Sequence, residues 1–321
     1  MSKPHTMGGA IPLQQASSPA NSVFPYPENA HTLWLNSGRA AFQCLLEALP
    51  TRPERVWLPR FICHTLLQAT ERLQLNTEFY CVDDHLRPIL PTGLNEQDTV
   101  VLVNYFGLTL QAVKNAAKTL PCPAIMDATT AFYSPAPAGM AAFYSPRKFT
   151  GLADGGIAVA PFELQHLLPS KQQADTYSTL LLQQANENTV QQAEDALNAP
   201  PMRMGNTTRA LMLATDWEQT AKQRLDNYHT LHSALAGINR LHLPDKPTHA
   251  PMCYPLVSGI PELRDSLIDQ GLRLPLYWPE VIETTDALQT ENRLARTLLP
   301  LPLDQRYGEA DMQRLIHMIL E

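Results

Sequence analysis

Residues 144–159 read YSPRKFTGLADGGIAV, and they predict a strand end, a turn and the start of a second strand. The apolar runs Met140–Ser145 and Gly156–Ala160 have the composition of buried strands. Between them the chain carries Lys148 and returns through Asp154-Gly155-Gly156. A lysine in a mostly apolar neighbourhood is either an ordinary surface residue or a desolvated amine that can act as a nucleophile. This stretch alone leaves both interpretations open.

Upstream of this stretch, apolar strands alternate with amphipathic helices. Further strands are expected at Val56–Pro59, Thr77–Val82, Thr99–Phe106 and Ala124–Asp127. Segments of helical period lie between several of the strands, at Arg39–Leu49, His64–Leu73 and Leu110–Leu120. Most of the strands are apolar on both faces, as in a parallel sheet that helices cover on both sides. The sequence therefore predicts an α/β fold with a mainly parallel sheet.

The second half of the chain predicts mostly helices. A polar helix is expected over residues 174–199, ended by Pro200-Pro201, and a second long helix over Asn206–Leu235. Later elements are expected at Cys253–Val257 (strand), Glu262–Gly271 (helix) and Glu309–Leu320 (helix). The predicted organisation is an N-terminal arm over 1–30, a large α/β domain over 31–239 and a small α+β domain over 240–321.

Composition and charge exclude several classes of protein. Of the 321 residues, 24 are Lys or Arg and 31 are Asp or Glu, so no strong basic field exists to hold nucleic acid or an anionic membrane. No run approaches 18 apolar residues and the N-terminus lacks an apolar core, so we expect a cytoplasmic protein that is neither secreted nor membrane-spanning. The five cysteines form no CxxC pair, which argues against a disulfide framework and against a zinc site; no metal is expected.

Two further segments carry chemistry. In Asn36–Phe42, NSGRAAF, Ser37 can cap a helix whose free N–H groups form a phosphate seat, and Gly38 lets a ligand approach; an ordinary capped helix is the alternative. The strand at 124–127 ends on Asp127, which could bind a metal, cap a helix or pair with a buried cation. Ligands of open α/β sheets bind at such strand ends. A phosphate seat, this acid and a lysine 21 residues beyond it are what a pyridoxal phosphate (PLP) site requires.

With these segments in this order, nearly the whole chain resembles the DegT-type nucleotide-sugar aminotransferases, and in particular a divergent branch found with bacterial surface-polysaccharide enzymes. The motifs that carry the resemblance are NSGRAAF (36–42), LPRFICHT (58–65), VNYFG (103–107), MDATTAF (126–132), YSPRKFTGLADGGIAV (144–159), RLDNYHTL (224–231) and LPLDQRY (301–307). The resemblance implies a fold-type-I PLP-dependent transferase with a mainly parallel large-domain sheet and a smaller α+β C-terminal domain.

The resemblance also implies roles for single residues. Lys148 would form the Schiff base with PLP and Asp127 would pair with the pyridine nitrogen. The phosphate would be bound by Gly38 and Arg39 after the Ser37 cap, and by the Ser145 hydroxyl. An Asn that reaches the partner subunit in many relatives is replaced by Pro201.

Other departures from the family lie around the expected cofactor ring. Thr130 stands where a Gln or His usually follows the acid, and Asn104 stands in place of the His of His-x-Tyr-Gly. The aromatic residue that stacks on the ring falls on Cys63, and of the two substitutes, His64 and Phe61, His64 is preferred. A histidine at a helix start that faces solvent is the alternative interpretation of His64.

The expected function is PLP-dependent amino transfer to a keto sugar, carried on a nucleotide, with an amino acid such as glutamate as donor. It would serve surface polysaccharide biosynthesis, in a homodimer. Two alternatives remain open at this point. One is a PLP-dependent sugar dehydratase or isomerase, which the presence of Lys148 disfavours because relatives that dehydrate replace this lysine. The other is a non-catalytic PLP-fold protein with a binding or regulatory role.

Overall fold

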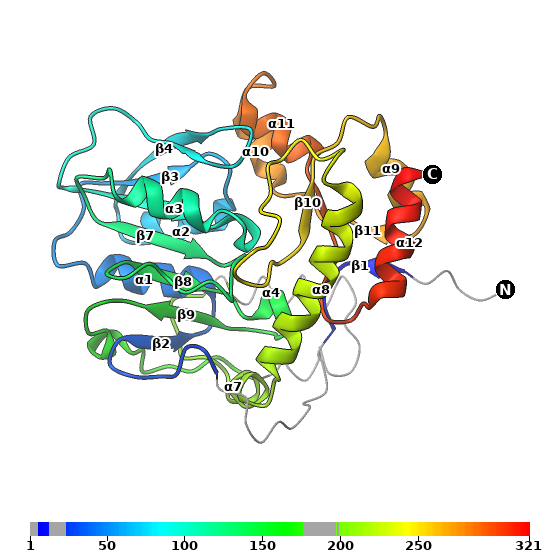
Figure 1. Ribbon diagram of the computed structural model, residues 1–321. Helices are drawn as coiled ribbons and strands as arrows, with labels where there is room; N and C mark the ends of the chain where they lie inside the picture. The colour runs from blue at the N-terminus through cyan, green and yellow to red at the C-terminus, as the bar shows by residue number, and fades with distance from the viewer. Residues whose placement is uncertain (1–5, 13–23, 176–196, 198) are drawn as a thin grey trace.

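The computed structural model describes residues 6–12, 24–175, 197 and 199–321. Its main feature is an eight-stranded sheet with the order β2-β9-β8-β7-β6-β3-β4-β5 (Figure 1). The strands are β2 (Thr32–Leu35), β3 (Arg55–Pro59), β4 (Asn76–Val82), β5 (Pro88–Ile89), β6 (Asp98–Val103), β7 (Ala124–Ala128), β8 (Ala141–Tyr144) and β9 (Gly156–Val159). Strands β4, β3, β6, β7 and β8 pair in parallel, and β5, β9 and β2 add antiparallel pairings toward the edges. The predicted α/β class is confirmed.

The central strands β3, β6, β7 and β8 are buried over most of their length, as their apolar runs predict. Every residue of β6 and of β8 is buried, because helices and loops cover both faces of the sheet. The predicted strand Thr99–Phe106 ends earlier, at Val103. A 3-10 turn follows it over Tyr105–Gly107 (η2), in which Phe106 has a positive φ of 57°. The chain therefore leaves the sheet at Asn104.

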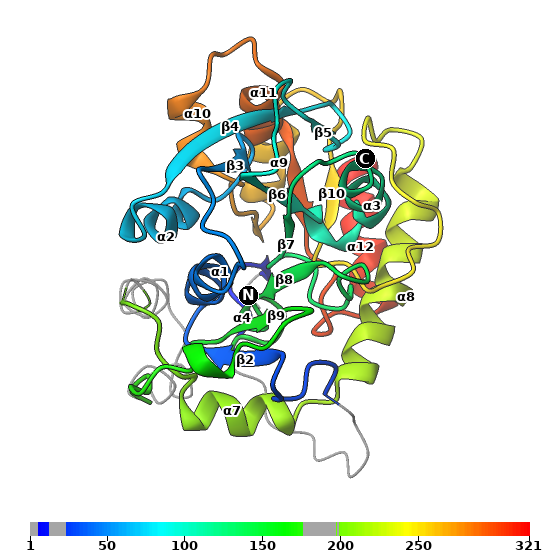
Figure 2. The ribbon, with the colours of Figure 1, turned by 90° about the vertical axis from the view of Figure 1, so that its left-hand side faces the viewer.

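Helix α1 (Gly38–Glu47) lies against the sheet where β8 and β9 pair. Its cap is the predicted one, because the Ser37 Oγ accepts a hydrogen bond from Ala40 N at 3.1 Å. Figure 2 looks along this helix and shows β8, β9 and the short helix α4 (Arg147–Thr150) beside it. The other predicted helices are observed as a 3-10 turn His64–Leu66 (η1) followed by α2 (Leu67–Arg72), and as α3 (Leu110–Ala117).

The single helix predicted over Asn206–Leu235 is wrong, because the structure has two. Helix α7 spans Asn206–Leu213 and α8 spans Trp217–Leu235. Asp216 begins the second helix by accepting a hydrogen bond from Gln219 N at 2.9 Å, and the Trp217 indole donates to Met212 O at 2.8 Å across the break. A local cap thus outweighs a continuous helical pattern. Most of the polar helix predicted at 174–199 lies outside the described residues.

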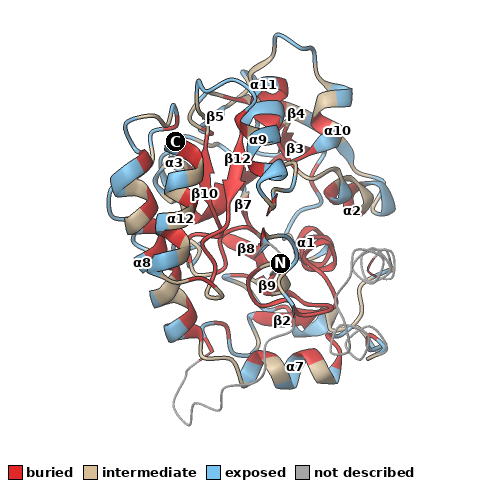
Figure 3. Ribbon diagram, turned by 90° about the vertical axis from the view of Figure 1, so that its right-hand side faces the viewer, coloured by how far each residue is buried: buried red, intermediate tan, exposed pale blue. Residues whose placement is uncertain are grey.

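The C-terminal part builds a smaller α+β layer. It contains β10 (Tyr254–Leu256) paired antiparallel with β12 (Leu299–Leu301), and β11 (Leu272–Arg273) paired in parallel with β1 (Met7–Gly8). Its helices are α9 (Leu263–Asp269), α10 (Pro279–Thr284), α11 (Thr290–Thr297) and α12 (Glu309–Leu320). In Figure 3 the strands β7, β8, β10 and β12 are largely buried, and the outer faces of α8 and α12 are exposed.

Two hydrophobic cores hold these layers together. The larger core surrounds the eight-stranded sheet and includes Val281 and Leu294 from α10 and α11. The smaller core includes the C-terminal half of α8 together with Met7 from the N-terminal arm. Helix α8 therefore packs with the C-terminal layer, while α10 and α11 pack against the larger core. The boundary expected at 239/240 stays a prediction.

Part of the N-terminal arm is an integral part of this fold. Met7 is fully buried, and Gly8 N donates to the Tyr307 hydroxyl at 2.8 Å. Further along, Ile11 O lies so close to Gly151 that a side chain there would meet it at 2.1 Å. Residues 6–12 thus contact the end of α4. Within the described residues, the structure contains no helix with the length and apolar character that a membrane span needs.

Candidate cofactor site

The predicted lysine and acid meet at the carboxyl ends of β7 and β8. Asp127 lies near the end of β7, and Lys148 lies in α4, directly after β8. Thr129 bridges the two: its N–H donates to Asp127 Oδ1 at 2.8 Å, and its hydroxyl accepts from Lys148 Nζ at 3.3 Å. The parallel register of the two strands, with Asp127 opposite Phe143, brings both residues to one edge. Ligands of α/β sheets bind at this kind of edge.

The N-terminus of α1 lies against the same edge. A side chain built at Gly38 would place its Cβ 3.1 Å from Thr129 Cγ2 and 3.7 Å from Ser145 Cβ. Ser145 itself is buried. The structure thus brings Ser37, Gly38 and Ser145 to the lysine and the acid, and a Cβ at residue 38 would crowd the space between them. A helix N-terminus offers free N–H groups and a positive dipole end to an anion such as phosphate.

The glycine pair after Lys148 has a structural reason. Gly155 N donates to Asn36 O at 2.8 Å, and a Cβ at Gly156 would lie 2.0 Å from Ser37 O. Strand β9 can therefore pass directly beside the turn that begins α1 only because residue 156 has no side chain. Asp154 accepts from Gly205 N at 2.7 Å. The contacts of residues 154–156 thus hold the turn that begins α1 in place.

Asp127 is the electrostatic centre of the site. Its carboxyl is buried, and this desolvation raises its pKa, although the nearby Lys148 ammonium and the Thr129 N–H act in the opposite direction. A second positive group beside this carboxyl would favour its ionised form. A protonated pyridine nitrogen is such a group, so the environment of Asp127 fits the role that the resemblance assigns to it.

Asn104 gives a second sign that the site accommodates a polar group. It follows β6, the strand beside β7, and it is completely buried. Its Nδ2 has no hydrogen-bond partner among the described residues. Buried donors in native proteins almost always have a partner. Together with the N-terminus of α1 and the buried carboxyl of Asp127, this unused donor fits a bound PLP.

Thr130 is at the predicted place, and its hydroxyl is already engaged. The Oγ1 accepts from Phe106 N at 3.1 Å and donates to Asn104 O at 3.4 Å. The side chain therefore holds the η2 turn against β7. Whether Thr130 also contacts a cofactor stays a prediction.

The Arg39 and His64 side chains lie toward neighbouring helical elements. Arg39 is almost buried, and its guanidinium donates to Gln68 Oε1 of α2. Its backbone, at the second residue of α1, remains part of the predicted phosphate seat. His64 is half-buried at the start of η1, which contacts α1. Both residues thus lie in or beside α1, and their roles at a cofactor stay predictions.

Phe61, the alternative to His64, is a core residue. It is fully buried, its ring packs against Tyr105 and Trp278 at 5.6 and 5.1 Å between ring centroids, and its carbonyl accepts from the Tyr105 hydroxyl at 2.6 Å. Cys63 beside it is half-buried, with its sulfur 3.1 Å from the Thr65 hydroxyl. The ring-stacking role therefore stays predicted for His64.

Thr129 and Arg224 were not predicted as site residues. Thr129 could have been suspected, because an Asp at a strand end commonly accepts from the N–H two residues on. Arg224 is fully buried and donates to Phe149 O at 3.0 Å and to Met252 O at 2.9 Å, while burial lowers its pKa. Gln305 also donates to Phe149 O, at 2.8 Å. The motifs at 224–231 and 301–307 therefore fix the residue that follows Lys148.

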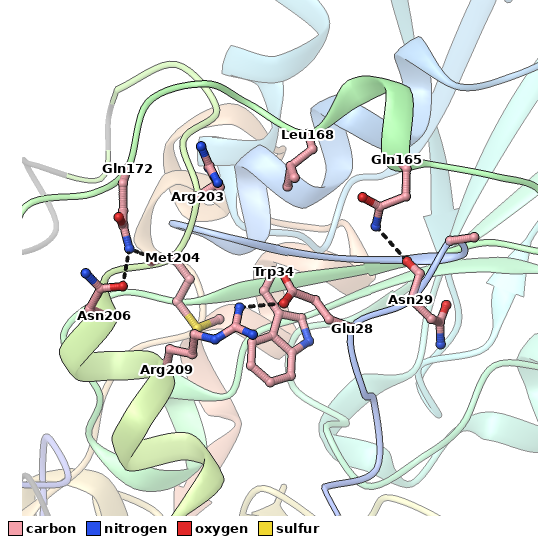
Figure 4. Close-up of a pocket in the computed structure, with 11 residues that line it drawn as sticks. Glu28, Asn29, Trp34, Gln165, Leu168, Gln172, Arg203, Met204, Asn206 and Arg209 are labelled. Atoms are coloured by element: carbon pink, nitrogen blue, oxygen red, sulfur yellow. Dashed lines mark hydrogen bonds and ion pairs between the residues drawn. The ribbon is translucent and has the colours of Figure 1, made fainter.

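A cavity of about 530 Å³ lies elsewhere, beside β2 (Figure 4). Its wall contains none of the predicted site residues. Arg209 forms an ion pair with Glu28 and stacks over the Trp34 ring at 4.8 Å, and Gln172 donates to Asn206 at 2.6 Å. The remaining lining residues are Asn29, Ala30, Gln165, Leu168, Arg203 and Met204. Among the described residues, no cluster of His, Cys, Asp or Glu could hold a metal ion.

The fold is shared with known structures, although the sequence matches no protein-family model and no curated relative. The PLP form of Spr1654 from Streptococcus pneumoniae, described as a sugar aminotransferase, superposes with a TM-score of 0.68 at 13% identity, over 98% of both chains. The sugar aminotransferase CalS13 from Micromonospora echinospora gives 0.63 at 17% identity, over 90% of this chain and 86% of that one. A DegT DnrJ EryC1 StrS aminotransferase from Brucella abortus gives 0.62 at 16%, over 90% and 85%. The chain therefore has the fold of the DegT-type sugar aminotransferases.

Proposed function

We propose that this protein is a PLP-dependent aminotransferase that converts a keto sugar into an amino sugar. The observation that carries the proposal is the contact of Lys148 and Asp127 through Thr129, next to the N-terminus of α1. The fold similarity to sugar aminotransferases supports the substrate class. We further propose that the sugar is nucleotide-linked and that an amino acid such as glutamate is the donor. The product would serve surface polysaccharide biosynthesis, and the enzyme would act in the cytoplasm.

Each residue of the site has a part in holding the cofactor. The backbone of Gly38 and Arg39, with the hydroxyls of Ser37 and Ser145, would bind the phosphate. Asp127 would pair with the pyridine nitrogen, and an ion pair at 4 Å contributes about 4 kcal/mol at an effective dielectric of 20. Lys148 Nζ would form the covalent link. When bound, PLP supplies an electron sink for bonds at the substrate carbon.

The chain's own groups then control protons and water. Lys148 Nζ is the amine placed to move a proton once an incoming amine has displaced it, and the Thr129 hydroxyl orients it. Burial of Asp127 excludes water from the carboxylate and strengthens its attraction for a positive group. Arg224 and Gln305 donate hydrogen bonds to Phe149 O, so the backbone next to Lys148 is held in place. This arrangement suits transfer of an amino group.

The deciding experiment follows the visible absorption of the purified protein with PLP, then with glutamate and a keto sugar. We expect a PLP-dependent band that glutamate converts and that the keto sugar restores. Borohydride reduction and peptide mapping should place the adduct on Lys148, and Lys118→Ala, which changes an exposed lysine on the α3 side, should label as the wild type does. Binding without conversion would instead support a non-catalytic PLP-fold protein, and loss of a sugar hydroxyl would support a dehydratase.

We also propose a homodimer with the cofactor sites near the interface. The family resemblance implies a site built from two chains, and obligate interfaces commonly bury more than about 2,000 Å². Sedimentation at low micromolar concentration should therefore give twice the mass of one chain. A monomer that still binds PLP tightly would contradict this proposal and would indicate a site rebuilt within one chain at Pro201.

A further inference from the structure

Arg224 joins the helix that carries Lys148 to the C-terminal layer. It lies on α8 and is completely buried. Its Nη2 donates to Phe149 O at 3.0 Å, and its Nη1 donates to Met252 O at 2.9 Å. Its Nε donates to Gln305 Oε1 at 3.0 Å, and Gln305 donates in turn to Phe149 O at 2.8 Å. One guanidinium thus connects α4 with the segments before β10 and after β12.

The surroundings of Arg224 indicate a geometric role for its guanidinium. All of its hydrogen-bond partners in the described part of the chain are carbonyl or amide oxygens, and the Asp304 carboxylate nearby pairs with Arg306 at 2.6 Å. Burying a cation without a carboxylate partner costs free energy. The guanidinium supplies a rigid fork of donors that can hold several oxygens at once, which no other side chain provides. Its placement therefore favours a role in fixing positions over a role in stability.

The helix that carries Lys148 depends on such contacts, because the sheet does not extend to it. Strands β7 and β8 pair up to Ala128 and Tyr144, and α4 begins beyond that pair, at Arg147. Helix α4 has four residues, and no side chain of the described residues caps its N-terminus. A helix this short is not stable on its own. The position of Lys148 is therefore set by groups that bind α4 from outside.

A second branch of these contacts reaches the residues after Asp127. Met252, whose carbonyl accepts from Arg224, donates from its own N to Phe106 O at 2.9 Å. Phe106 N donates to Thr130 Oγ1 at 3.1 Å, and Thr130 lies in the turn that follows β7. Arg224 is therefore connected with the lysine on one side and with the acid on the other.

We propose that Arg224 is a positioning residue for amino transfer, which fixes Lys148 relative to Asp127 by binding the backbone carbonyl of Phe149. This inference rests on the proposed function, because it requires Lys148 to be the reacting amine. Gln305 shares the role, since it binds the same carbonyl. The C-terminal layer thereby determines where the reacting amine lies, although that amine follows a strand of the large sheet.

The test uses Arg224→Lys, which keeps the charge but cannot hold all of these oxygens in one plane. The measured quantities are hydrogen exchange of residues 147–151 in the PLP-free protein, the rate at which the visible band forms after PLP is added, and the kcat and KM of amino transfer from glutamate to a keto sugar. We expect about tenfold faster exchange, about tenfold slower band formation and about tenfold lower kcat, because a small displacement of a reacting group lowers a rate strongly. The KM for glutamate should stay within about twofold, because the variant changes the reacting amine and not the binding of the donor.

Gln305→Leu is the second variant, and it keeps the inference testable if Arg224→Lys does not fold. It removes the other donor to Phe149 O and leaves the guanidinium in place. The same quantities should therefore change in the same direction by a smaller factor.

Thr220→Val is the control, because it changes a buried polar group on the same helix, one turn before Arg224. The Thr220 hydroxyl lies 2.5 Å from the Tyr133 hydroxyl. The variant should lower the melting temperature, while exchange of residues 147–151, band formation and kcat stay within about twofold of the wild type.

The outcomes separate the inference from the proposed function. Either wild-type exchange in 147–151 or a wild-type kcat in the folded Arg224 and Gln305 variants would overturn the inference and leave the PLP assignment intact. Equal losses of kcat in Arg224→Lys and Thr220→Val would also overturn it, because they would show a general loosening of α8. A wild-type protein that forms no visible band with PLP would overturn the proposed function, and the inference with it.

Discussion

The proposed cofactor site and the cavity beside β2 differ in whether their polar side chains have hydrogen-bond or ion-pair partners. The cavity is roomy, at about 530 Å³, yet the charged groups in its wall already have partners. Arg209 pairs with Glu28 and stacks over the Trp34 ring, and Arg203 donates to Ser170 O at 3.2 Å. The proposed cofactor site contains buried polar groups without a full set of partners. Burial raises the pKa of the Asp127 carboxyl, and the Asn104 side-chain amide has a donor without an acceptor among the described residues.

The difference shows that volume alone does not locate chemistry. A buried charge or donor without a full set of partners destabilises a protein, and a bound ligand that completes the set removes this cost. Paired surface charges contribute little to stability and need no ligand. We therefore expect function to depend on the edge of β7 and β8 and not on the cavity.

Replacing Lys148 by Ala should have the largest effect. The variant loses the amine that forms the covalent link and moves the proton, so amino transfer should fall by about a thousandfold or more. PLP could still bind through the phosphate seat. The matched change in the cavity, Arg209→Ala, should keep activity within about twofold. An equal loss of amino-transfer activity in Lys148→Ala and Arg209→Ala would show that the reaction does not depend on the edge of β7 and β8 more than on the cavity.

Asp127→Asn should have the next largest effect. The two side chains are nearly isosteric, so the fold should persist, but the counter-charge for the pyridine nitrogen is lost. We expect the half-reaction with glutamate to slow by about a hundredfold and PLP binding to weaken. Stopped-flow absorption measures both quantities. Unchanged kinetics would show that Asp127 does not pair with the pyridine nitrogen and that it only caps a helix or forms a turn.

Gly38→Ala should have a smaller effect, limited to cofactor affinity. The added Cβ would lie 3.1 Å from Thr129 Cγ2 and would narrow the phosphate seat, so the dissociation constant of PLP should rise about tenfold. Gly237→Ala is the control, because a Cβ there meets nothing within 4 Å. Titration of both variants with PLP decides the matter. Wild-type affinity in Gly38→Ala would place the phosphate elsewhere.

The smallest effect concerns the stability of the PLP-free protein. Burial raises the pKa of Asp127 above its unfolded value. The folded state therefore holds this proton more tightly, and the stability that protonation contributes is present at acid pH and lost as pH rises through the folded pKa. At neutral pH, PLP-free Asp127→Asn should melt a few degrees above the wild type, with the gap closing in acid. A lower melting temperature of the variant at neutral pH would show that the buried Asp127 carboxylate does not destabilise the PLP-free protein.

Several features of the site follow from local sequence patterns. The apolar strands, the Ser37 cap and the α/β class could be predicted, because periodicity and capping act over a few residues. Lys148 and Asp127 could be predicted as a pair because parallel strands end at a common edge. The long helix at 206–235 could not be resolved into two, since the Asp216 cap competes with a pattern that continues across it.

The amino-acid sequence by itself therefore determined the parallel sheet, the turn that carries Lys148 and the acid at the preceding strand end. Only the tertiary structure decided which side chains are engaged: Thr129 joins Asp127 to Lys148, Thr130 holds the η2 turn, Arg39 contacts Gln68 and Asn104 keeps an unused donor. The physical reason is that secondary structure depends on local backbone preferences. The partners of a buried polar group come from distant segments, and packing alone brings those segments together.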